Sequence, residues 1–224
     1  MRKKFASIQA VIKDYNKSFK EIDEYKKVKW SSKESMINRY KLFFRTIKKT
    51  PIKNWLDIGF GTGAIFQYHD KILTNIDNSF GLELNKNLYK LTKKKFFKKR
   101  VELYNSNVLD FNSKKRFDLI SALGVMQNCG YSYKGFLSKI KKLLNKNGFL
   151  FITSKNILWN KFSEGLTPEK DHLWFNPYDV LSFLKKKNFL IKKINGFDPS
   201  TGKEKNLKES HTFYIFCRLK YDFK

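Results

Sequence analysis

The chain has 224 residues, of which 41% are hydrophobic and 22 are Phe, and its formal net charge is +27. A chain of this length can bury roughly 70% of the surface that its unfolded form exposes, so the composition excludes a disordered protein and favours an aromatic-rich core. The charge suggests a polyanionic partner. Nearly all of it is Lys, however, spread over every predicted helix, whereas nucleic-acid sites favour Arg. Coding biased toward A and T explains this excess as well, so nucleic acid is a possible but not a favoured partner.

The two cysteines and the N-terminus narrow the class of protein further. Cys129 and Cys217 form no CxxC pair and have no metal-ligand spacing, so neither a disulfide framework nor a metal site is predicted. The basic start of the chain is not followed by a continuous apolar stretch, and no run of about 18 apolar residues occurs anywhere. We therefore expect a soluble, cytoplasmic protein without a membrane span.

Residues 1–50 predict a helical segment that precedes the main domain. Ser31 and Glu34 have the spacing of a capping box. Apolar residues then recur at helical spacing at Met36, Tyr40, Phe43, Phe44 and Ile47. We expect this helix to pack on the sheet or to cover its carboxyl edge as a lid.

Residues 51–224 alternate short apolar runs with amphipathic segments, which is typical of a mostly parallel sheet flanked by helices. The pattern predicts a single α/β unit with seven strands and a C-terminal hairpin. The predicted strands are residues 55–58, 80–84, 101–104, 117–122, 149–153, 189–194 and 212–219, and residues 198–210 form a polar loop. The predicted helices are residues 63–69, 86–97, 133–144 and 177–187, the last one capped by Asn176 with Pro177 at its first position.

A glycine-rich turn follows the first predicted strand. Gly59, Gly61 and Gly63 stand at alternate positions, where glycine allows positive φ and lets a ligand approach the backbone. With Ala64 the spacing also fits the dinucleotide-binding pattern of dehydrogenases. Asp57 favours a ligand with an amino-acid moiety over a dinucleotide, because a carboxylate at the strand end attracts a ligand's ammonium group and repels a pyrophosphate.

The run from Leu56 to Gly63 resembles motif I of the class I S-adenosylmethionine-dependent methyltransferases, and the resemblance extends over residues 53–154. It implies a Rossmann-like fold, S-adenosyl-L-methionine as cofactor and S-adenosyl-L-homocysteine as product. Gly81 to Asn85 is similar to the end of the family's second strand, whose acidic residue binds the ribose hydroxyls. Glu83 matches that residue, with Asp77 as the rival.

The resemblance also indicates where the adenine binds. The family usually has an acidic residue after its third strand, and the matching stretch here runs from Asn105 to Asp110. Asn107 is the counterpart, although an Asn is a departure from the pattern and Asp110 stays an alternative; Val108 lies beside it. Leu123 belongs to the stretch that resembles the fourth strand and the loop below the cofactor. Trp30 with Arg39 and Tyr40 is similar to a lead-in segment that closes the cofactor site in some members.

The acceptor side is predicted in the long connection after the fifth strand. His172 lies there and could act as the general base for a hydroxyl acceptor. Trp174, Phe175 and Tyr178 would form an apolar wall beside it. Asn176 and Pro177 resemble part of the tetrad of amino-methylating enzymes, but one proline after the fifth strand favours a helix cap.

We thus expect methylation of a small or medium molecule, such as a sugar, a lipid head group or a natural product, with O-methylation ahead of N-methylation. Two alternatives stay open. The first is an RNA methyltransferase that uses the lysine-rich residues 93–95 and 98–100. The second is an inactive cofactor-binding subunit, which would have no physical need for the intact glycines and Glu83.

Overall fold

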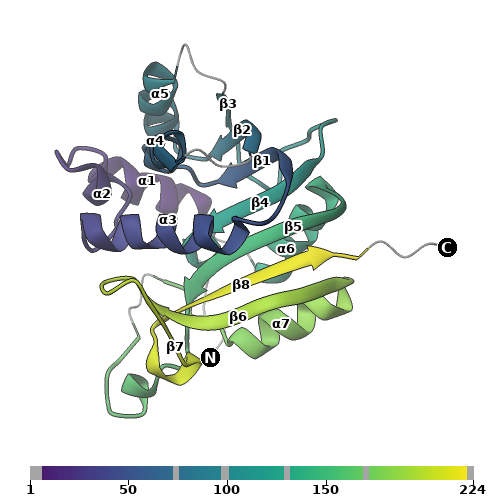
Figure 1. Cartoon of the computed structure of the whole chain (residues 1–224). Coiled ribbons are helices and arrows are strands. Elements are labelled where there is room, and N and C mark those ends of the chain that lie inside the picture. The colour runs from purple at the N-terminus through teal and green to yellow at the C-terminus, as the bar shows by residue number, and fades with distance from the viewer. Residues whose placement is uncertain (1–6, 73–75, 97–100, 129–131, 169–171, 221–224) are drawn as a thin grey trace.

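The fold is a mostly parallel, eight-stranded sheet with helices on both faces (Figure 1). It is known from a computed structural model, which describes residues 7–72, 76–96, 101–128, 132–168 and 172–220. The strand order is β3-β2-β1-β4-β5-β8-β6-β7. The strands are β1 Ile52–Ile58, β2 Ile76–Glu83, β3 Val101–Asn105, β4 Phe117–Leu123, β5 Leu144–Lys155, β6 Phe189–Asp198, β7 Lys203–Lys205 and β8 Thr212–Leu219. The predicted α/β class and the seven predicted strands are confirmed.

The first five strands of the chain are parallel, so their carboxyl ends meet at one edge of the sheet. In the register of β1 and β2, Asp57 pairs with Gly81 and Ile58 with Leu82. The loops that leave these strands therefore converge at the same edge, which is where ligands bind in open α/β sheets.

The structure has one strand more than predicted, β7. It lies within residues 198–210, which were predicted to form a polar loop, so that prediction was wrong for these three residues. The chain turns back after β6 because the Asp198 carboxylate accepts from the Ser200 backbone and Gly202 adopts a φ of +74°. The three residues of β7 then pair with the end of β6. Such a short, fully polar strand has no apolar alternation, so sequence patterning does not reveal it.

Two hydrophobic clusters lie on the two faces of the sheet. One is formed with α3 Lys33–Ile47 and α4 Ala64–Ile72, and the other with α6 Tyr133–Leu143 and α7 Pro177–Lys186. In Figure 1, α3 crosses the front of the sheet while α6 and α7 lie behind it. The cap of α3 differs from the prediction by one residue: Ser32, rather than Ser31, accepts the hydrogen bond from the Ser35 backbone. Asn176 caps α7 as predicted.

The remaining helices lie near the carboxyl edge of the parallel strands. They are α1 Ile8–Ser18, α2 Glu24–Lys27 and α5 Lys86–Lys95. α1 and α2 contribute no buried residue. Among the described residues, no helix combines the length and the apolar character that crossing a membrane requires. Cys129 lies outside the described residues, and Cys217 is a buried free thiol.

Candidate active site

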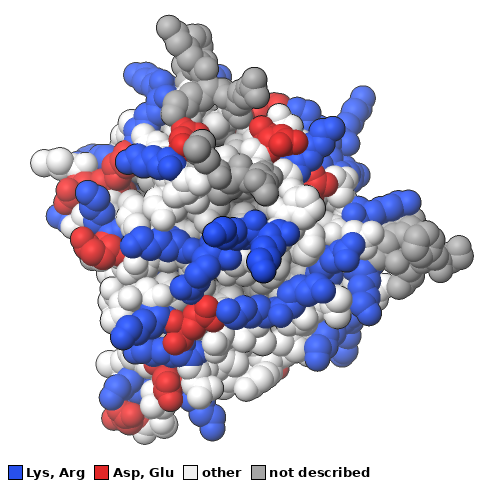
Figure 2. All heavy atoms as spheres, viewed as in Figure 1, with Lys and Arg blue, Asp and Glu red and all other residues white. Residues whose placement is uncertain are grey.

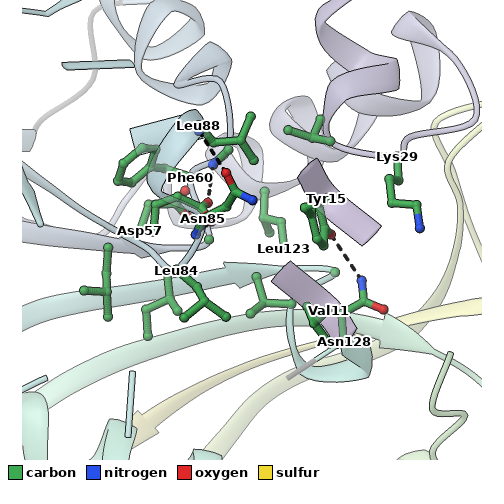
Figure 3. A pocket seen from close by; sticks show the side chains of 18 of the residues that line it. Val11, Tyr15, Lys29, Asp57, Phe60, Leu84, Asn85, Leu88, Leu123 and Asn128 are labelled. Atoms are coloured by element: carbon green, nitrogen blue, oxygen red, sulfur yellow. Dashed lines mark hydrogen bonds between the residues drawn. The ribbon is translucent and has the colours of Figure 1, made fainter. Parts of the chain in front are cut away.

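A cavity opens at the carboxyl edge of the parallel strands (Figure 3). Its walls come from the loops that follow β1, β2, β3 and β4, from α1, and from the segment that leads into α3. The structure brings together here, as lining residues, all but one of the predicted cofactor-binding residues: Asp57, Gly59, Gly61, Glu83, Asn107, Val108 and Leu123. Gly63, the remaining one, belongs to the same glycine turn.

The glycine turn after β1 holds backbone conformations that favour glycine. Gly59, Gly61 and Gly63 have φ values of +76°, +58° and +75°. A β carbon on Gly61 would clash with the Val28 side chain, and one on Gly59 would lie 2.5 Å from that of Val125. Glycine is therefore required at these positions both by the backbone and by the side chains that cover the turn.

Glu83 ends β2 with a buried carboxylate that is tied to this turn. Its two oxygens accept hydrogen bonds from the backbone N–H groups of Gly61 at 2.9 Å and Asn85 at 2.8 Å. Burial raises the pKa of Glu83, and these backbone hydrogen bonds act in the opposite direction. A carboxylate has about four acceptor sites, so two are left for the hydroxyls of a ligand. The rival Asp77 is exposed near the start of β2 and does not line the cavity.

Asp57 is the second buried carboxyl group of the cavity. Burial raises the pKa of Asp57 to about 8, although the hydroxyl of Ser121 donates to its Oδ1 and lowers it. The Ser121 oxygen in turn accepts from the Trp55 indole at 2.7 Å. Lys29 is the single Lys or Arg among the described lining residues. A cavity with two carboxyl groups and so little positive charge suits a cationic ligand.

The loop after β3 places Asn107 rather than Asp110 at the cavity. Asn107 and Val108 line it, whereas Asp110 is exposed. The Asn107 Oδ1 accepts from the Leu109 backbone at 3.1 Å, which fixes the side chain in a local turn. Leu123 forms another apolar part of the lining at the end of β4.

α1 belongs to the segment predicted as a helical lid and lines the cavity, but none of its residues was named as a site residue. Val11 and Tyr15 extend from α1 into the cavity, together with Ile12 (Figure 3). Asn128 donates to the Tyr15 hydroxyl at 3.4 Å, and the Asn16 Oδ1 accepts from Asn85 at 2.9 Å. The spacing of Ile8, Val11, Ile12 and Tyr15 is that of one helix face, so the sequence did contain a signal for an apolar face on this helix.

The segment that leads into α3 closes another side of the cavity. Trp30 and Tyr40 line it, and a β carbon on Gly124 would lie 2.6 Å from the Trp30 ring. The Arg39 guanidinium lies 4.1 Å from the centre of the Trp30 ring and donates to the Ser35 carbonyl. Burial lowers the pKa of Arg39 to about 9, and no carboxylate of a described residue lies within ion-pair distance of it.

The acceptor residues predicted from the sequence are only partly brought to the cavity. His172 lines it. Phe175 is buried in the core beside α6 and α7, and Tyr178 is exposed on α7. Trp174 packs against the Phe162 ring, 4.8 Å away between ring centres. These three side chains do not line the cavity: the Phe175 backbone pairs with Lys155 and Ile157 at the end of β5, and Tyr178 lies in the first turn of α7.

Comparisons with known proteins agree with this geometry. A family model described as a methyltransferase domain matches residues 56–152, which include the glycine turn, Glu83 and the carboxyl ends of β1 to β4. Residues 56–152 form a methyltransferase domain, and the chain is an S-adenosylmethionine-dependent methyltransferase with the class I, Rossmann-like fold. The dehydrogenase and the inactive subunit are thereby set aside, and S-adenosylmethionine is the cofactor.

Individual relatives of this methyltransferase are distant. Ubiquinone biosynthesis O-methyltransferase of Pelagibacter ubique (strain HTCC1062) is 25% identical over 87% of this chain and 85% of that protein. The N-methyltransferase NodS from Bradyrhizobium japonicum WM9, in complex with S-adenosyl-L-homocysteine, superposes with a TM-score of 0.69 at 12% identity, over 94% of this chain and 99% of that one. Magnesium protoporphyrin IX methyltransferase from Synechocystis PCC 6803 gives 0.67 at 12% identity, over 94% and 99%. The solved structures share the fold.

The residues of the cavity fit the cofactor. Its sulfonium and ammonium groups are cations, and the cavity offers two buried carboxyl groups, Asp57 and Glu83, that form no ion pair with a described residue, since Lys29 pairs with Asp14. The glycine turn and the apolar Val108 and Leu123 supply the close backbone approach and the flat contacts that a nucleoside needs.

Proposed function

We propose that this methyltransferase transfers a methyl group to a hydroxyl of a small or medium molecule, and that His172 is the general base. The observation that supports this most is the position of His172. It is the one histidine among the described residues that line the cavity, and it lies in the same cavity as the glycine turn. A hydroxyl acceptor must lose a proton as it is methylated, and an imidazole within hydrogen-bond reach can accept it.

Each cofactor-binding residue has a proposed role that follows from its chemistry. Glu83 would accept from the ribose hydroxyls, and Asn107 with Val108 would hold the adenine. Asp57 would attract the ammonium group of the amino-acid moiety. Arg39, a buried cation without a described acidic partner, would lie toward its carboxylate behind Trp30. The glycines at 59, 61 and 63 would allow the close approach of the backbone, and Leu123 would pack below.

The protein's own contribution to the reaction is mainly alignment. The cofactor supplies an activated methyl group, whose transfer to the acceptor oxygen leaves a neutral thioether. His172 takes the hydroxyl proton, and the cavity walls hold the acceptor in line with the methyl. Because Trp174, Phe175 and Tyr178 lie outside the lining, we propose Tyr15, Gln127 and Asn128 as the acceptor wall in their place.

Support for an oxygen acceptor over a nitrogen acceptor comes from two sources. The curated relative is named as an O-methyltransferase, whereas the NodS structure is named as an N-methyltransferase and shares the fold alone. A neutral amine needs no strong base, so a histidine at the cavity fits a hydroxyl better.

The RNA alternative has less support from the structure. Lys95 donates to the Thr62 carbonyl and pairs with Glu24, so it binds the glycine turn to α2 rather than facing solvent freely. Lys93 and Lys94 are exposed on α5, and residues 98–100 lie outside the described part of the chain.

Methylation of a cell extract with isotope-labelled S-adenosylmethionine tests the proposal. We expect the label in the small-molecule or lipid fraction and not in RNA. His172→Asn should lower the rate at least a hundredfold at saturating cofactor while the affinity for S-adenosylhomocysteine is unchanged. His69→Asn is the matched control, since His69 stacks on Phe44 away from the cavity. Label in RNA, or an undiminished rate for His172→Asn, would reject the corresponding part of the proposal.

A further inference from the structure

A second groove lies at the opposite edge of the sheet from the cofactor cavity. It is bounded by the C-terminal half of α3, by α4, and by the first residues of β1 and β2, Ile52 and Ile76. β1 and β2 end at the cofactor cavity and begin at this groove, so the two sites are separated by the length of these strands. The lining residues are Lys41, Phe44, Arg45, Ile47, Lys48, Thr50, Ile52, Tyr68, Ile72 and Ile76.

The floor of this groove is apolar and partly open to solvent. Phe44, Ile47 and Ile52 are buried beneath it. Ile72 is one of the few large apolar side chains of the described chain that are exposed, at 38%. Tyr68 stacks on Phe44, with 5.8 Å between ring centres. The floor thus offers a small apolar surface, formed by Tyr68, Ile72 and Ile76, that solvent can reach.

The rim of the groove is basic. Lys41, Arg45 and Lys48 follow each other at helical spacing along one face of α3 and are exposed. Arg45 pairs with Glu204 of β7 at 3.0 Å. Lys41 and Lys48 have no ion pair with any described residue. Figure 2 shows Lys and Arg side chains gathered across the middle of this face, over α3.

No carboxylate belongs to the described lining of the groove. Asp70 on α4 and Asp77 on β2 are exposed on the neighbouring surface, but neither lines it. The groove thus combines an aliphatic and aromatic floor with two uncompensated ammonium groups on one side. Lys side chains can lie along apolar surface while their ammonium groups stay in water, which places the charge at the edge of the floor.

We propose that this groove binds a single-chain amphipathic anion: a hydrocarbon chain on Tyr68, Ile72 and Ile76, with a carboxylate or phosphate at Lys41 and Lys48. The hydrocarbon chain gains free energy by leaving water, and the gain grows with each CH₂ group that is buried. The anion adds a charge contact at the rim. A polynucleotide would leave the aliphatic floor unused, and a membrane docked here would face away from the methyl-transfer cavity.

Titration calorimetry with three probes below their micelle concentrations tests both halves of the ligand. The probes are dodecyl phosphate, inorganic phosphate and dodecylphosphocholine. We expect dodecyl phosphate to bind at least tenfold more tightly than either of the others. Saturating S-adenosylhomocysteine should leave its affinity unchanged. Equal affinity for inorganic phosphate would overturn the proposal, because it would show that the hydrocarbon chain does not contribute to binding. Displacement of dodecyl phosphate by S-adenosylhomocysteine would also overturn it, because the probe would then lie in the cofactor cavity.

Variants locate the site. Lys41→Glu with Lys48→Glu should weaken dodecyl phosphate binding at least tenfold, and Ile72→Ser should weaken it severalfold; all three side chains are exposed, so the fold is retained. Lys185→Glu with Lys186→Glu, exposed on α7 across the sheet, makes the same change in charge and should have no effect. If both double variants weakened dodecyl phosphate binding equally, the attraction of the probe to the protein's positive charge would be nonspecific. The proposal would also be overturned if the protein bound no dodecyl phosphate but did bind single-stranded RNA or vesicles with anionic phospholipid. If the Lys41→Glu, Lys48→Glu variant alone lost that binding, the groove would belong to those partners instead.

Discussion

Two helices of the N-terminal segment, α1 and α3, both carry an apolar face but use it differently. α3 buries eight residues, among them Phe43, whose ring lies 5.4 Å from that of Trp55 and 5.2 Å from that of Phe151. α1 buries none, and Val11, Ile12 and Tyr15 face the cavity. The bonds that hold α1 come mainly from side chains such as Asn16 and Tyr15.

This difference separates an element of the core from a cover. Within the predicted helical segment of residues 1–50, the helix after Ser31 was expected to pack on the sheet or to cover its carboxyl edge, and α3 packs in a core cluster with β1, β5 and β8. We infer that the covering role belongs to α1 and to the segment that contains Val28 and Trp30. Because α1 has no buried residue and is held by a few polar contacts, we expect it to move at low cost when the cofactor exchanges.

The largest expected effect is on stability, when an apolar side chain on α3 is truncated and compared with one on α1. Phe43→Ala should lower the free energy of unfolding by about 3–5 kcal/mol, because it leaves a cavity under the sheet. Ile12→Ala should lower it by less than about 1 kcal/mol, since Ile12 is only half-buried. Urea denaturation of the cofactor-free protein measures both. Similar losses would mean that α1 is part of the core after all.

Removal of residues 1–22 should separate stability from cofactor binding. The deletion ends at Ile22, which is fully open to solvent, and leaves α2 and Lys29 in place. We expect cooperative unfolding to persist and the affinity for S-adenosylhomocysteine to fall at least tenfold, about 1.4 kcal/mol, as the cavity loses one wall. Calorimetry of the truncated and full chains gives both affinities. A truncated protein that binds as tightly as the full chain would refute the role of α1 as a cover.

The surfaces beneath the two helices should also respond differently to pH. α3 packs mainly on apolar side chains, whereas α1 lines the cavity that contains Asp57 and Glu83. At pH 7, below its pKa of about 8, Asp57 is mostly protonated. A bound cation favours the ionised form, so cofactor binding should release up to about one proton. Calorimetry in buffers of different ionisation enthalpy measures this. Asp57→Asn should release less, and the exposed Asp77→Asn should match the wild type; identical release from all three would exclude Asp57 as the source.

The smallest effect concerns Lys29, which lies in the turn between α2 and Trp30. Lys29 has a φ of +61° at the position after α2 where glycine is usual, and the Trp30 N–H bonds to the Tyr25 carbonyl. Lys29→Gly and Lys29→Ala both remove the charge that pairs with Asp14, but only glycine removes the β carbon. Lys29→Gly should therefore be more stable than Lys29→Ala by about 1 kcal/mol in thermal unfolding. Equal stabilities would show that this turn carries no strain.

Much of the fold was predictable because periodicity reports how a segment is buried. The alternation of apolar runs gave seven strands, and the motif around Gly59 with Glu83 located the cavity edge. β7 was missed because its three residues, including Glu204, are polar and are held by Tyr214 and Arg45 from elsewhere in the chain. Such contacts are not encoded in local sequence.

The site was predictable to the extent that backbone geometry demands a residue type. Few other residues can replace a glycine with positive φ or a carboxylate at a strand end, so the roles of these positions could be predicted from the sequence. The wall of the acceptor pocket has no such constraint. Trp174, Phe175 and Tyr178 are close to His172 in sequence, but Phe175 pairs with the backbone at the end of β5 and Tyr178 lies on α7. Tyr15 lines the cavity from the N-terminal part of the chain. An apolar helix face indicates that something is covered, without indicating what.

The contact between Trp30 and Gly124 has a practical consequence for studying this enzyme. The Trp30 ring lies at the cavity wall against Gly124 and the Arg39 guanidinium, so a ligand that enters must change its surroundings. Trp55 is sealed in the core, and Trp159 and Trp174 pack around Phe162. Of the four tryptophans that contribute to the intrinsic fluorescence, Trp30 lines the cavity and the other three do not. Trp30→Phe would give the blank for such a measurement, and opening of the cover could be followed in real time without any attached dye.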